Sequence, residues 1–231
     1  MQTKITEIEK KIGVKFKNKD LLLQAFVHRS YLNENKDFHL EHNERLEFLG
    51  DACLELIVTD YLYNNYPNPE GELTNWRAAL VKGVTISKVA KKLGYEEHLL
   101  LSRGESKSTG RARELILANT FEASLGAIYL DQGYDVADKF VKKNLIPYLA
   151  EIISKELYYD PKSRFQEMVQ EKTGITPIYK LVSEKGPDHA KVFVMAATIG
   201  DKMVAEGTGP SKQTAEQEAA RVAIEVWEKE L

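Results

Sequence analysis

Residues 43–52 read NERLEFLGDA, a segment in which acidic and apolar residues recur at helical spacing. On an α-helix, Glu44, Glu47 and Asp51 lie at positions i, i+3 and i+7 and therefore share one face. A second stripe of the same helix is apolar and consists of Leu46, Leu49, Cys53 and Leu56. Because an apolar stripe is typical of a helix packed against a core, the segment predicts a buried helix with three carboxylates along one side.

Three carboxylates on one helix face repel one another, at a cost of a few tenths of a kcal/mol per pair. A divalent cation would remove this cost, and carboxylate oxygens suit Mg²⁺ or Mn²⁺ better than zinc. The alternative is an acidic face that is simply solvated. Gly50 argues against that alternative, because a glycine inside a helix costs about 1 kcal/mol relative to alanine and usually has a packing reason. We expect Gly50 to let another helix, or a second copy of this one, approach closely.

A second acidic position lies far along the chain, in residues 117–123, LANTFEA. Helical spacing sets Asn119 and Glu122 on one face of an otherwise apolar helix. A buried carboxylate is expected to be paired or bound to a metal. A salt bridge from Glu122 to Arg45 or Arg113 is the structural alternative, so spacing alone gives a two-helix acidic centre as a hypothesis.

Composition indicates an ordinary globular protein of one or two domains, with 231 residues, 43% hydrophobic and 29% charged. A single cysteine cannot form an internal disulfide, which favours a reducing compartment. The charged start, residues 1–13, has no apolar region of a secretory signal, and no run approaches the ~18 apolar residues that span a membrane. We therefore expect a soluble, cytoplasmic protein. The net charge of −3 leaves the kind of partner undecided.

The pattern changes character between residues 156 and 160, which divides the chain into two expected domains. Residues 1–156 are expected to form an all-α domain, with helices that include about 73–81 and 136–153. Residues 160–231 show the order α-β-β-β-α, which makes an α+β domain with an antiparallel sheet backed by two helices. Its elements are expected near residues 163–172, 178–183, 191–199, 202–207 and 212–227, with a hairpin turn at Gly200-Asp201.

The run NERLEFLGDACLEL, residues 43–56, resembles the signature of the ribonuclease III family. Three further blocks are similar to family blocks in the right order: FVHRSY at 26–31, EGELT at 70–74 and ILANTFEASLGAIYLD at 116–131. The second domain is similar to the double-stranded-RNA-binding domain. The resemblance covers essentially the whole chain and implies an endoribonuclease specific for double-stranded RNA.

The resemblance also implies roles for individual carboxylates. Glu47, Asp51 and Glu122 look like metal-binding and catalytic residues, with Mg²⁺ as the metal and Mn²⁺ as its substitute. Glu44 looks like a residue of the catalytic valley that a dimer forms. Glu70 looks like an outer acidic residue near the scissile phosphate.

A homodimer is part of what the family implies, with two centres that cut opposite strands and leave 5′-phosphate and 3′-hydroxyl ends with a short 3′ overhang. The implied work is processing of ribosomal and messenger RNA. We expect the interface at the apolar face near Phe48, Leu49 and Ala52, with Gly50.

Asn119 departs from the family, which usually has aspartate three residues before the catalytic glutamate. An amide oxygen still ligates a cation, but it brings no charge and cannot act as a base. The departure admits three explanations: an engineered inactivating substitution, a natural variation, or deamidation that restores the acid in a fraction of molecules. Asn119 is accordingly placed among the metal ligands as a weak one.

The second domain contains blocks similar to the three RNA-contacting regions of its family. The residues placed at these contacts are Gln166, Glu167, His189, Ser211 and Lys212. Gln166 and Glu167 are expected in a minor groove of the RNA, and His189 in the next minor groove. Ser211 and Lys212 are expected at the phosphates between them. Such contacts recognise the A-form shape of the duplex. Where the family often has a lysine pair, this chain has Lys212-Gln213, so one phosphate contact fewer is expected.

Two other functions remain open from the sequence. The first is a catalytically impaired protein that binds double-stranded RNA without cutting it, because Asn119 replaces the usual aspartate. The second is a metal-dependent nuclease acting on DNA, which fits the carboxylates but not the second domain.

Overall fold

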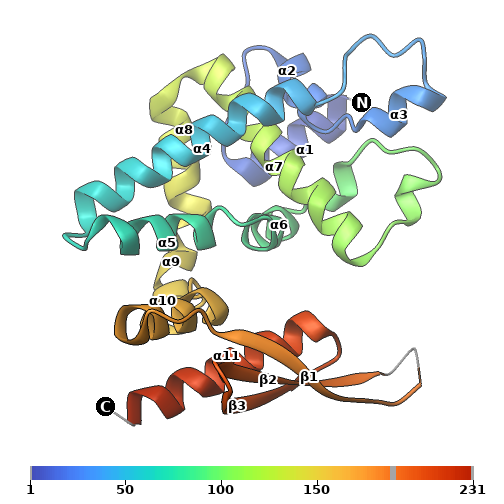
Figure 1. Ribbon diagram of the computed structural model, residues 1–231. Coiled ribbons are helices and arrows are strands. Elements are labelled where there is room, and N and C mark those ends of the chain that lie inside the picture. Colours follow the sequence, from blue (N-terminus) through green and yellow to red (C-terminus); the bar gives the residue numbers. More distant parts are fainter. Residues whose placement is uncertain (1, 188–190, 230–231) are drawn as a thin grey trace. The chain divides into compact units, whose positions relative to one another are not determined.

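The computed structural model describes residues 2–187 and 191–229 (Figure 1). His189, which the sequence places at an RNA contact, lies outside the described residues. The chain forms two compact units, Met1–Tyr158 and Tyr159–Leu231. Within the described ranges, no helix combines the length and the apolar character needed to cross a membrane.

The first unit is all-helical, as the sequence predicts. Its α-helices are α1 (Gln2–Ile12), α2 (Lys19–Ala25), α3 (Arg29–Glu34), α4 (Glu44–Asn65), α5 (Glu70–Leu80), α6 (Gly83–Lys92), α7 (Gly110–Gln132), α8 (Tyr134–Asn144) and α9 (Leu149–Ser154). Short 3-10 turns lie at η1 (Tyr95–His98), η2 (Glu105–Lys107) and η3 (Ile146–Tyr148). Helix α7 runs through the core of this unit, with Leu117, Phe121 and Leu125 fully buried.

Two helix boundaries differ from the prediction. The helix expected over about 136–153 is broken into α8, η3 and α9. Pro147 lies at the break, and proline cannot donate a helical hydrogen bond. Helix α5 begins at Glu70, earlier than expected, directly after Pro69. This earlier start places Glu70 in the first helical turn and not in a loop.

Helices α4 and α7 cross each other (Figure 1). Two glycines, Gly50 and Gly126, lie at their contact. A Cβ atom added to Gly50 would lie 1.8 Å from the backbone oxygen of Glu122, and one added to Gly126 would lie 2.3 Å from that of Leu46. Only glycine allows two helix backbones to approach this closely. The prediction that Gly50 admits another helix is confirmed, and that helix is α7 of the same chain.

The buried face of α4 is displaced from the apolar stripe expected from the sequence. Leu46 and Cys53 are buried as predicted, but Leu56 is 58% exposed and Leu49 is only partly buried. The contact with α7 at Gly50 sets the helix rotation, so that the buried row continues through Leu46, Gly50, Cys53, Leu54 and Ile57. The acidic residues consequently lie at the edge of the core and not opposite it.

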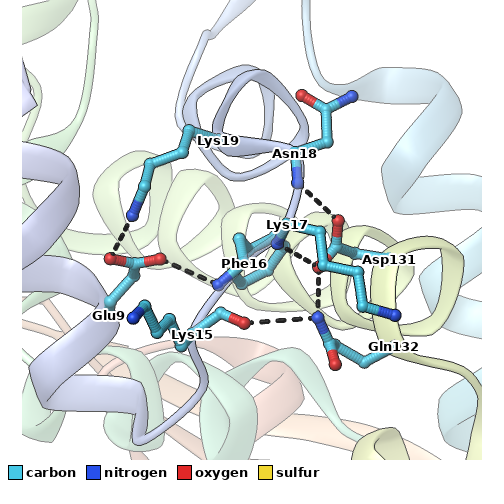
Figure 2. A network of polar contacts seen from close by, with 8 residues as sticks. All are labelled: Glu9, Lys15, Phe16, Lys17, Asn18, Lys19, Asp131 and Gln132. Carbon is cyan, nitrogen blue, oxygen red and sulfur yellow. Dashed lines mark hydrogen bonds and ion pairs between the residues drawn. The ribbon is translucent and has the colours of Figure 1, made fainter.

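The segment between α1 and α2 is held to the end of α7 by Asp131 (Figure 2). Its carboxylate accepts hydrogen bonds from the backbone N–H groups of Lys17 and Asn18, both at 2.8 Å. The Gln132 side chain donates to the Lys15 carbonyl at 3.2 Å. Burial alone would raise the pKa of Asp131, but the two backbone hydrogen bonds outweigh it and the pKa is lowered.

On the other side of the same segment, Glu9 of α1 accepts hydrogen bonds from the Phe16 N–H at 2.8 Å and from Lys19 Nζ at 2.6 Å (Figure 2). The segment is therefore fixed by two carboxylates from helices that are far apart in the sequence. The two carboxylates thereby link α1 and α7 through this segment.

Replacement of Asp131 by asparagine is expected to lower the free energy of unfolding by about 1–3 kcal/mol at neutral pH, because two backbone donors lose a charged acceptor. A carboxyl whose pKa is lowered by folding stabilises the folded state at pH values above its ordinary pKa. This stabilisation disappears as the pH falls through the lowered pKa. The variant and the wild type should therefore converge at acidic pH in urea-unfolding curves. The exposed Asp37→Asn is the control and should match the wild type at every pH.

The second unit has the order α-β-β-β-α that the sequence predicts. Its elements are α10 (Pro161–Thr173), β1 (Ile178–Lys185), β2 (Val192–Ile199), β3 (Lys202–Gly209) and α11 (Lys212–Lys229). The sheet has the strand order β1-β2-β3 with antiparallel pairs, and Gly200 has a positive φ of 57° in the predicted hairpin turn. The fold class is confirmed.

Helix α11 lies directly on β3 because small residues meet there. A Cβ atom added to Gly207 would lie 2.0 Å from the backbone nitrogen of Ala219. Phe165 and Val169 of α10 complete this core with Ala197 of β2. The close fit explains the alanine-rich sequence of α11, in which larger side chains would separate the helix from the sheet.

Candidate active site

The crossing of α4 and α7 brings the predicted acidic residues of the two helices together. Glu47 and Asp51 come from α4 on either side of Gly50, and Glu122 is the α7 residue whose backbone Gly50 touches. Asn119 lies one turn before Glu122. We call these four residues the acidic centre. Residues more than 65 positions apart in the sequence thus meet through one helix contact.

Glu122 is the most strongly perturbed carboxyl of the acidic centre. Burial raises its pKa to about 8, and the charges of Asp51 and Glu47 add to the effect. Such mutual effects require carboxylates within electrostatic range of one another. Burial and the neighbouring charges thus both favour the protonated form of the Glu122 carboxyl.

Glu47 lies next to two other acids and one amide. Burial raises its pKa, the charge of Glu44 raises it further, and Asp51 contributes in the same direction. A hydrogen bond with the Asn119 side chain opposes these effects. Asn119 of α7 thus contacts the Glu47 carboxylate of α4. Such a contact is expected if both side chains bind the same cation.

Glu44 lies beside the acidic centre, where its charge raises the pKa of Glu47, and Glu70 lies outside it. Glu44, in the first turn of α4, is exposed and lies 3.7 Å from both Arg29 and His42. Glu70 is exposed at the start of α5, where it lines a recess of about 550 Å³ between α4 and α5. It is not among the charges that shift the pKa of Glu47 or Glu122. The structure therefore brings four of the six predicted catalytic and metal residues together.

The structural alternative for Glu122, a salt bridge to an arginine, is wrong. Arg45 lies 4.0 Å from Glu41 and points into solvent. Arg113 is buried, lies 3.8 Å from Glu96 and donates hydrogen bonds to the carbonyls of Ser106 and Ser108. In the described part of the chain, no basic side chain forms an ion pair with Glu122.

The donor set of the acidic centre fits a hard divalent cation. Three carboxylates and an amide oxygen are the ligands that Mg²⁺ and Mn²⁺ prefer. Among residues 5–187 and 191–227, however, no three Asp, Glu, His or Cys side chains already converge on a common point as metal ligands. The partly buried Glu122 carboxyl, which has acidic neighbours and forms no ion pair with a basic side chain of the described residues, is the observation that favours a cation here.

The four predicted RNA-contacting residues that the structure describes in the second unit lie on or directly before two helices. Gln166 and Glu167 are exposed on α10. Ser211 and Lys212 are exposed at the start of α11, where Ser211 Oγ accepts a hydrogen bond from the Thr214 N–H at 3.1 Å. Ser211 therefore has a structural role as a helix cap, beside the RNA contact that the sequence predicts for it.

Comparison with known proteins decides the family. Residues 18–149 match the family model described as Ribonuclease-III-like, and residues 161–226 match the double-stranded RNA binding motif. The chain is 43% identical over 220 residues to Ribonuclease 3 of Streptococcus thermophilus, covering 95% of this chain and 96% of that protein. The chain belongs to the ribonuclease III family. With its RNA-binding motif, it is an endoribonuclease specific for double-stranded RNA.

Two further relatives agree with this assignment. Ribonuclease 3 of Geobacillus thermodenitrificans is 44% identical over 225 residues, covering 97% of this chain and 91% of that protein. A solved nuclease domain of ribonuclease III from Campylobacter jejuni superposes with a TM-score of 0.56 at 35% identity, covering 61% of this chain and 95% of that one. Its description names a region involved in dimer formation. These matches favour the nuclease over a protein that only binds RNA.

The apolar face expected at a ribonuclease III dimer interface needs one correction. Phe48 is 81% exposed and Ala52 is exposed, as an unpartnered interface requires. Gly50, in contrast, is buried against α7 and cannot belong to this face. The reason is the α4–α7 crossing, which the sequence could not distinguish from a contact between two copies.

Two arginines that hold elements of the first unit together are not evident as functional residues from the sequence. Arg113 fixes the loop before α7 through backbone carbonyls, and Arg77 of α5 binds Glu55 and Thr59 of α4. A signal existed for Arg77, because it follows Glu70 by seven residues and so lies on the same side of α5. For Arg113 the sequence offers no comparable signal, since its partners are backbone atoms.

Proposed function

We propose that the acidic centre is where this ribonuclease III hydrolyses phosphodiesters of double-stranded RNA, with Mg²⁺ bound by Glu47, Asp51, Asn119 and Glu122. Mn²⁺ is its substitute. The observation that supports this proposal is the partly buried Glu122 carboxyl, whose pKa is raised by burial and by two acids of another helix. When bound, the cation supplies charge neutralisation at the phosphate and activation of water.

The chain's own residues would prepare the site in distinct ways. Asp51 and Glu122 provide charge, and Asn119 holds the Glu47 carboxylate through a hydrogen bond. Because Asn119 has no charge, cation binding is expected to be weaker than with an aspartate. We propose that Glu44 belongs to the catalytic valley that a dimer forms, and that Glu70 acts as an outer acidic residue near the scissile phosphate. Cleavage of long double-stranded RNA by this chain and by Asn119→Asp tests this proposal.

Cation binding should release a proton from Glu122. Its pKa of about 8 means that the cation competes with a proton below that pH, so affinity should rise as the pH increases from 6 to 8 and then level off. Calorimetry of Mn²⁺ binding in buffers of different ionisation enthalpy measures this release. About one proton is expected at neutral pH or below. Equal affinity at pH 6 and pH 8 would exclude a protonated Glu122.

We further propose a homodimer formed through Phe48. This exposed ring lies beside a hollow of about 690 Å³, whose apolar lining includes Leu21, Leu49 and Leu130. A ring that protrudes next to a hollow with apolar lining is suited to an interface between two copies. In such a dimer, the Phe48 ring of each copy would enter the hollow of the other. Two acidic centres in one dimer would cut opposite strands and leave the 5′-phosphate and 3′-hydroxyl ends of the family.

Replacement of Phe48 by alanine is expected to weaken the dimer by about 2 kcal/mol or more, as the loss of a buried aromatic anchor does. Sedimentation velocity at micromolar concentration should show a dimer for the wild type and a monomer fraction for Phe48→Ala. Tyr63→Ala is the matched control, because Tyr63 is 78% exposed on the same helix and should leave the dimer unchanged. A strictly monomeric wild type would contradict the proposal.

For the second unit, we propose that Gln166 and Glu167 meet a minor groove, that Ser211 and Lys212 face phosphates, and that His189 reaches the next groove. The match to the double-stranded RNA binding motif supports this assignment. The substrates would be precursors of ribosomal and messenger RNA in the cytoplasm. Competition between RNA and DNA duplexes of equal length tests the substrate class, and cleavage of both at similar rates would contradict it.

A further inference from the structure

Arg77 of α5 forms a clamp onto two residues of α4. Its Nε lies 3.0 Å from Oε2 of Glu55, and its Nη1 donates a hydrogen bond to Thr59 Oγ1 at 2.9 Å. The Thr59 hydroxyl in turn donates to the Glu55 backbone carbonyl at 2.6 Å, so its lone pairs are available to the arginine. The three side chains therefore form one set of mutually compatible bonds.

The geometry of this clamp depends on the planar guanidinium group. Two of its N–H donors are used on two different acceptors, which a point charge such as lysine cannot reproduce. The side chains of Arg77 and Glu55 are only 35% and 41% exposed, so the pair is partly shielded from solvent. The clamp consequently fixes the direction in which α5 leaves α4.

The clamp connects two parts of the catalytic surface. Glu55 follows Asp51 by one helical turn on α4, and Arg77 follows Glu70 by two turns on α5. Glu70, Arg77 and Thr59 line the same recess between the two helices. Any change in the angle between α4 and α5 therefore moves Glu70 relative to Asp51.

We propose that Arg77 is a positioning residue for the reaction: through Glu55 and Thr59 it holds α5, and with it Glu70, at a fixed place relative to the acidic centre. This inference rests on the proposed function, in which Glu70 acts near the scissile phosphate. Arg77 also keeps the Glu55 carboxylate engaged one turn from Asp51, so that Glu55 does not join the acidic centre as a further ligand.

The contribution of the clamp is to geometry more than to stability. Partly exposed ion pairs stabilise folded proteins little, whereas a displacement of about 1 Å at a catalytic group reduces rates about a hundredfold. Arg77→Met should therefore keep the folded structure while kcat falls about tenfold to a hundredfold. RNA affinity should be retained, because the clamp faces Glu55 and Thr59.

The test compares Arg77→Met, Arg77→Lys and Thr59→Val in the full chain. Lys11→Met is the matched control, since it removes another ion pair of 3.0 Å between two elements, α1 and η1. The readouts are kcat and KM on long double-stranded RNA, thermal unfolding, and hydrogen exchange of the α5 amides. We expect kcat to decrease in the order wild type, Arg77→Lys, Arg77→Met, with faster exchange in the first turn of α5. Thr59→Val, which keeps the side-chain shape, should change both readouts in the same direction.

The possible outcomes distinguish a failure of the Arg77 clamp from a failure of the proposed function. Unchanged exchange in α5 for Arg77→Met and Thr59→Val would overturn the clamp, whether or not the protein cuts RNA. Faster exchange with wild-type kcat would overturn the catalytic role. A raised KM with unchanged kcat would mean that Arg77 contacts RNA directly, and would also overturn it. A wild type that binds RNA without cutting it would overturn the proposed function, while hydrogen exchange would still decide whether the clamp exists.

Discussion

Replacement of Gly50 by alanine is expected to lower the free energy of unfolding of the first unit by about 3 kcal/mol or more. The new methyl group would lie 1.8 Å from the Glu122 carbonyl oxygen, 2.5 Å from its carbon and 2.9 Å from the Gly126 nitrogen. All three are backbone atoms, which cannot rotate away. Helices α4 and α7 must therefore separate, and the gain in helix propensity, about 1 kcal/mol, is too small to compensate.

Gly71→Ala provides the control for this prediction. Gly71 lies in the first turn of α5, and a Cβ atom added there would meet no other atom within 4 Å. The same chemical change should therefore be neutral or stabilising by up to about 1 kcal/mol. Urea unfolding at equilibrium measures both variants. If Gly50→Ala were as stable as the wild type, the close crossing of α4 and α7 would be wrong.

Replacement of Glu122 by glutamine is expected to reduce cleavage by about 10²–10³-fold or more, since one charged group of a preorganised centre is lost. RNA affinity should remain, because Glu122 is grouped with the other acids of the first unit, whereas the double-stranded RNA binding motif spans residues 161–226. Mn²⁺ binding followed by calorimetry should weaken in parallel. Cleavage at the wild-type rate would show that the acidic centre is not the active site.

The same variant should be more stable than the wild type in the absence of a cation. Burial beside Asp51 and Glu47 raises the pKa of Glu122 from 4.5 to about 8, so the folded state binds a proton that the unfolded state releases. The wild type therefore loses stability as the pH rises from about 4.5 to 8, by on the order of a few kcal/mol. Glu122→Gln removes this dependence. Thermal unfolding at pH 5 and pH 8 measures it, and a variant less stable than the wild type at pH 8 would contradict the assignment.

Much of the site was predictable from periodicity. The spacing of Glu47 and Asp51 on one helix, and of Asn119 and Glu122 on another, follows from 3.6 residues per turn. Gly50 indicated a close helix contact, but a single sequence cannot tell whether the partner is α7 or a second copy. Because of that ambiguity, the sequence alone also allows Gly50 at the dimer face.

The remaining differences have tertiary causes. Leu56 fits the apolar stripe in sequence yet is largely exposed, because the glycine contact with α7 rotates α4. The ion pair of Arg77 with Glu55 joins two helices whose relative angle no local pattern specifies. Pro147 indicates the break between α8 and α9, but the apolar periodicity on both sides of it favours one continuous helix. Local propensity was informative in the second unit, where Gly200 and the alternation in β2 indicated the hairpin correctly.

Cleavage of long double-stranded RNA in Mg²⁺, by this chain and by Asn119→Asp side by side, tests the central claim most directly. If the acidic centre cuts RNA with Asn119 as an uncharged ligand, the wild type should yield short duplexes with 5′-phosphate ends. Asn119→Asp should then cut at a lower Mg²⁺ concentration. Binding of RNA by the wild type with no cleavage in either Mg²⁺ or Mn²⁺ would contradict the account.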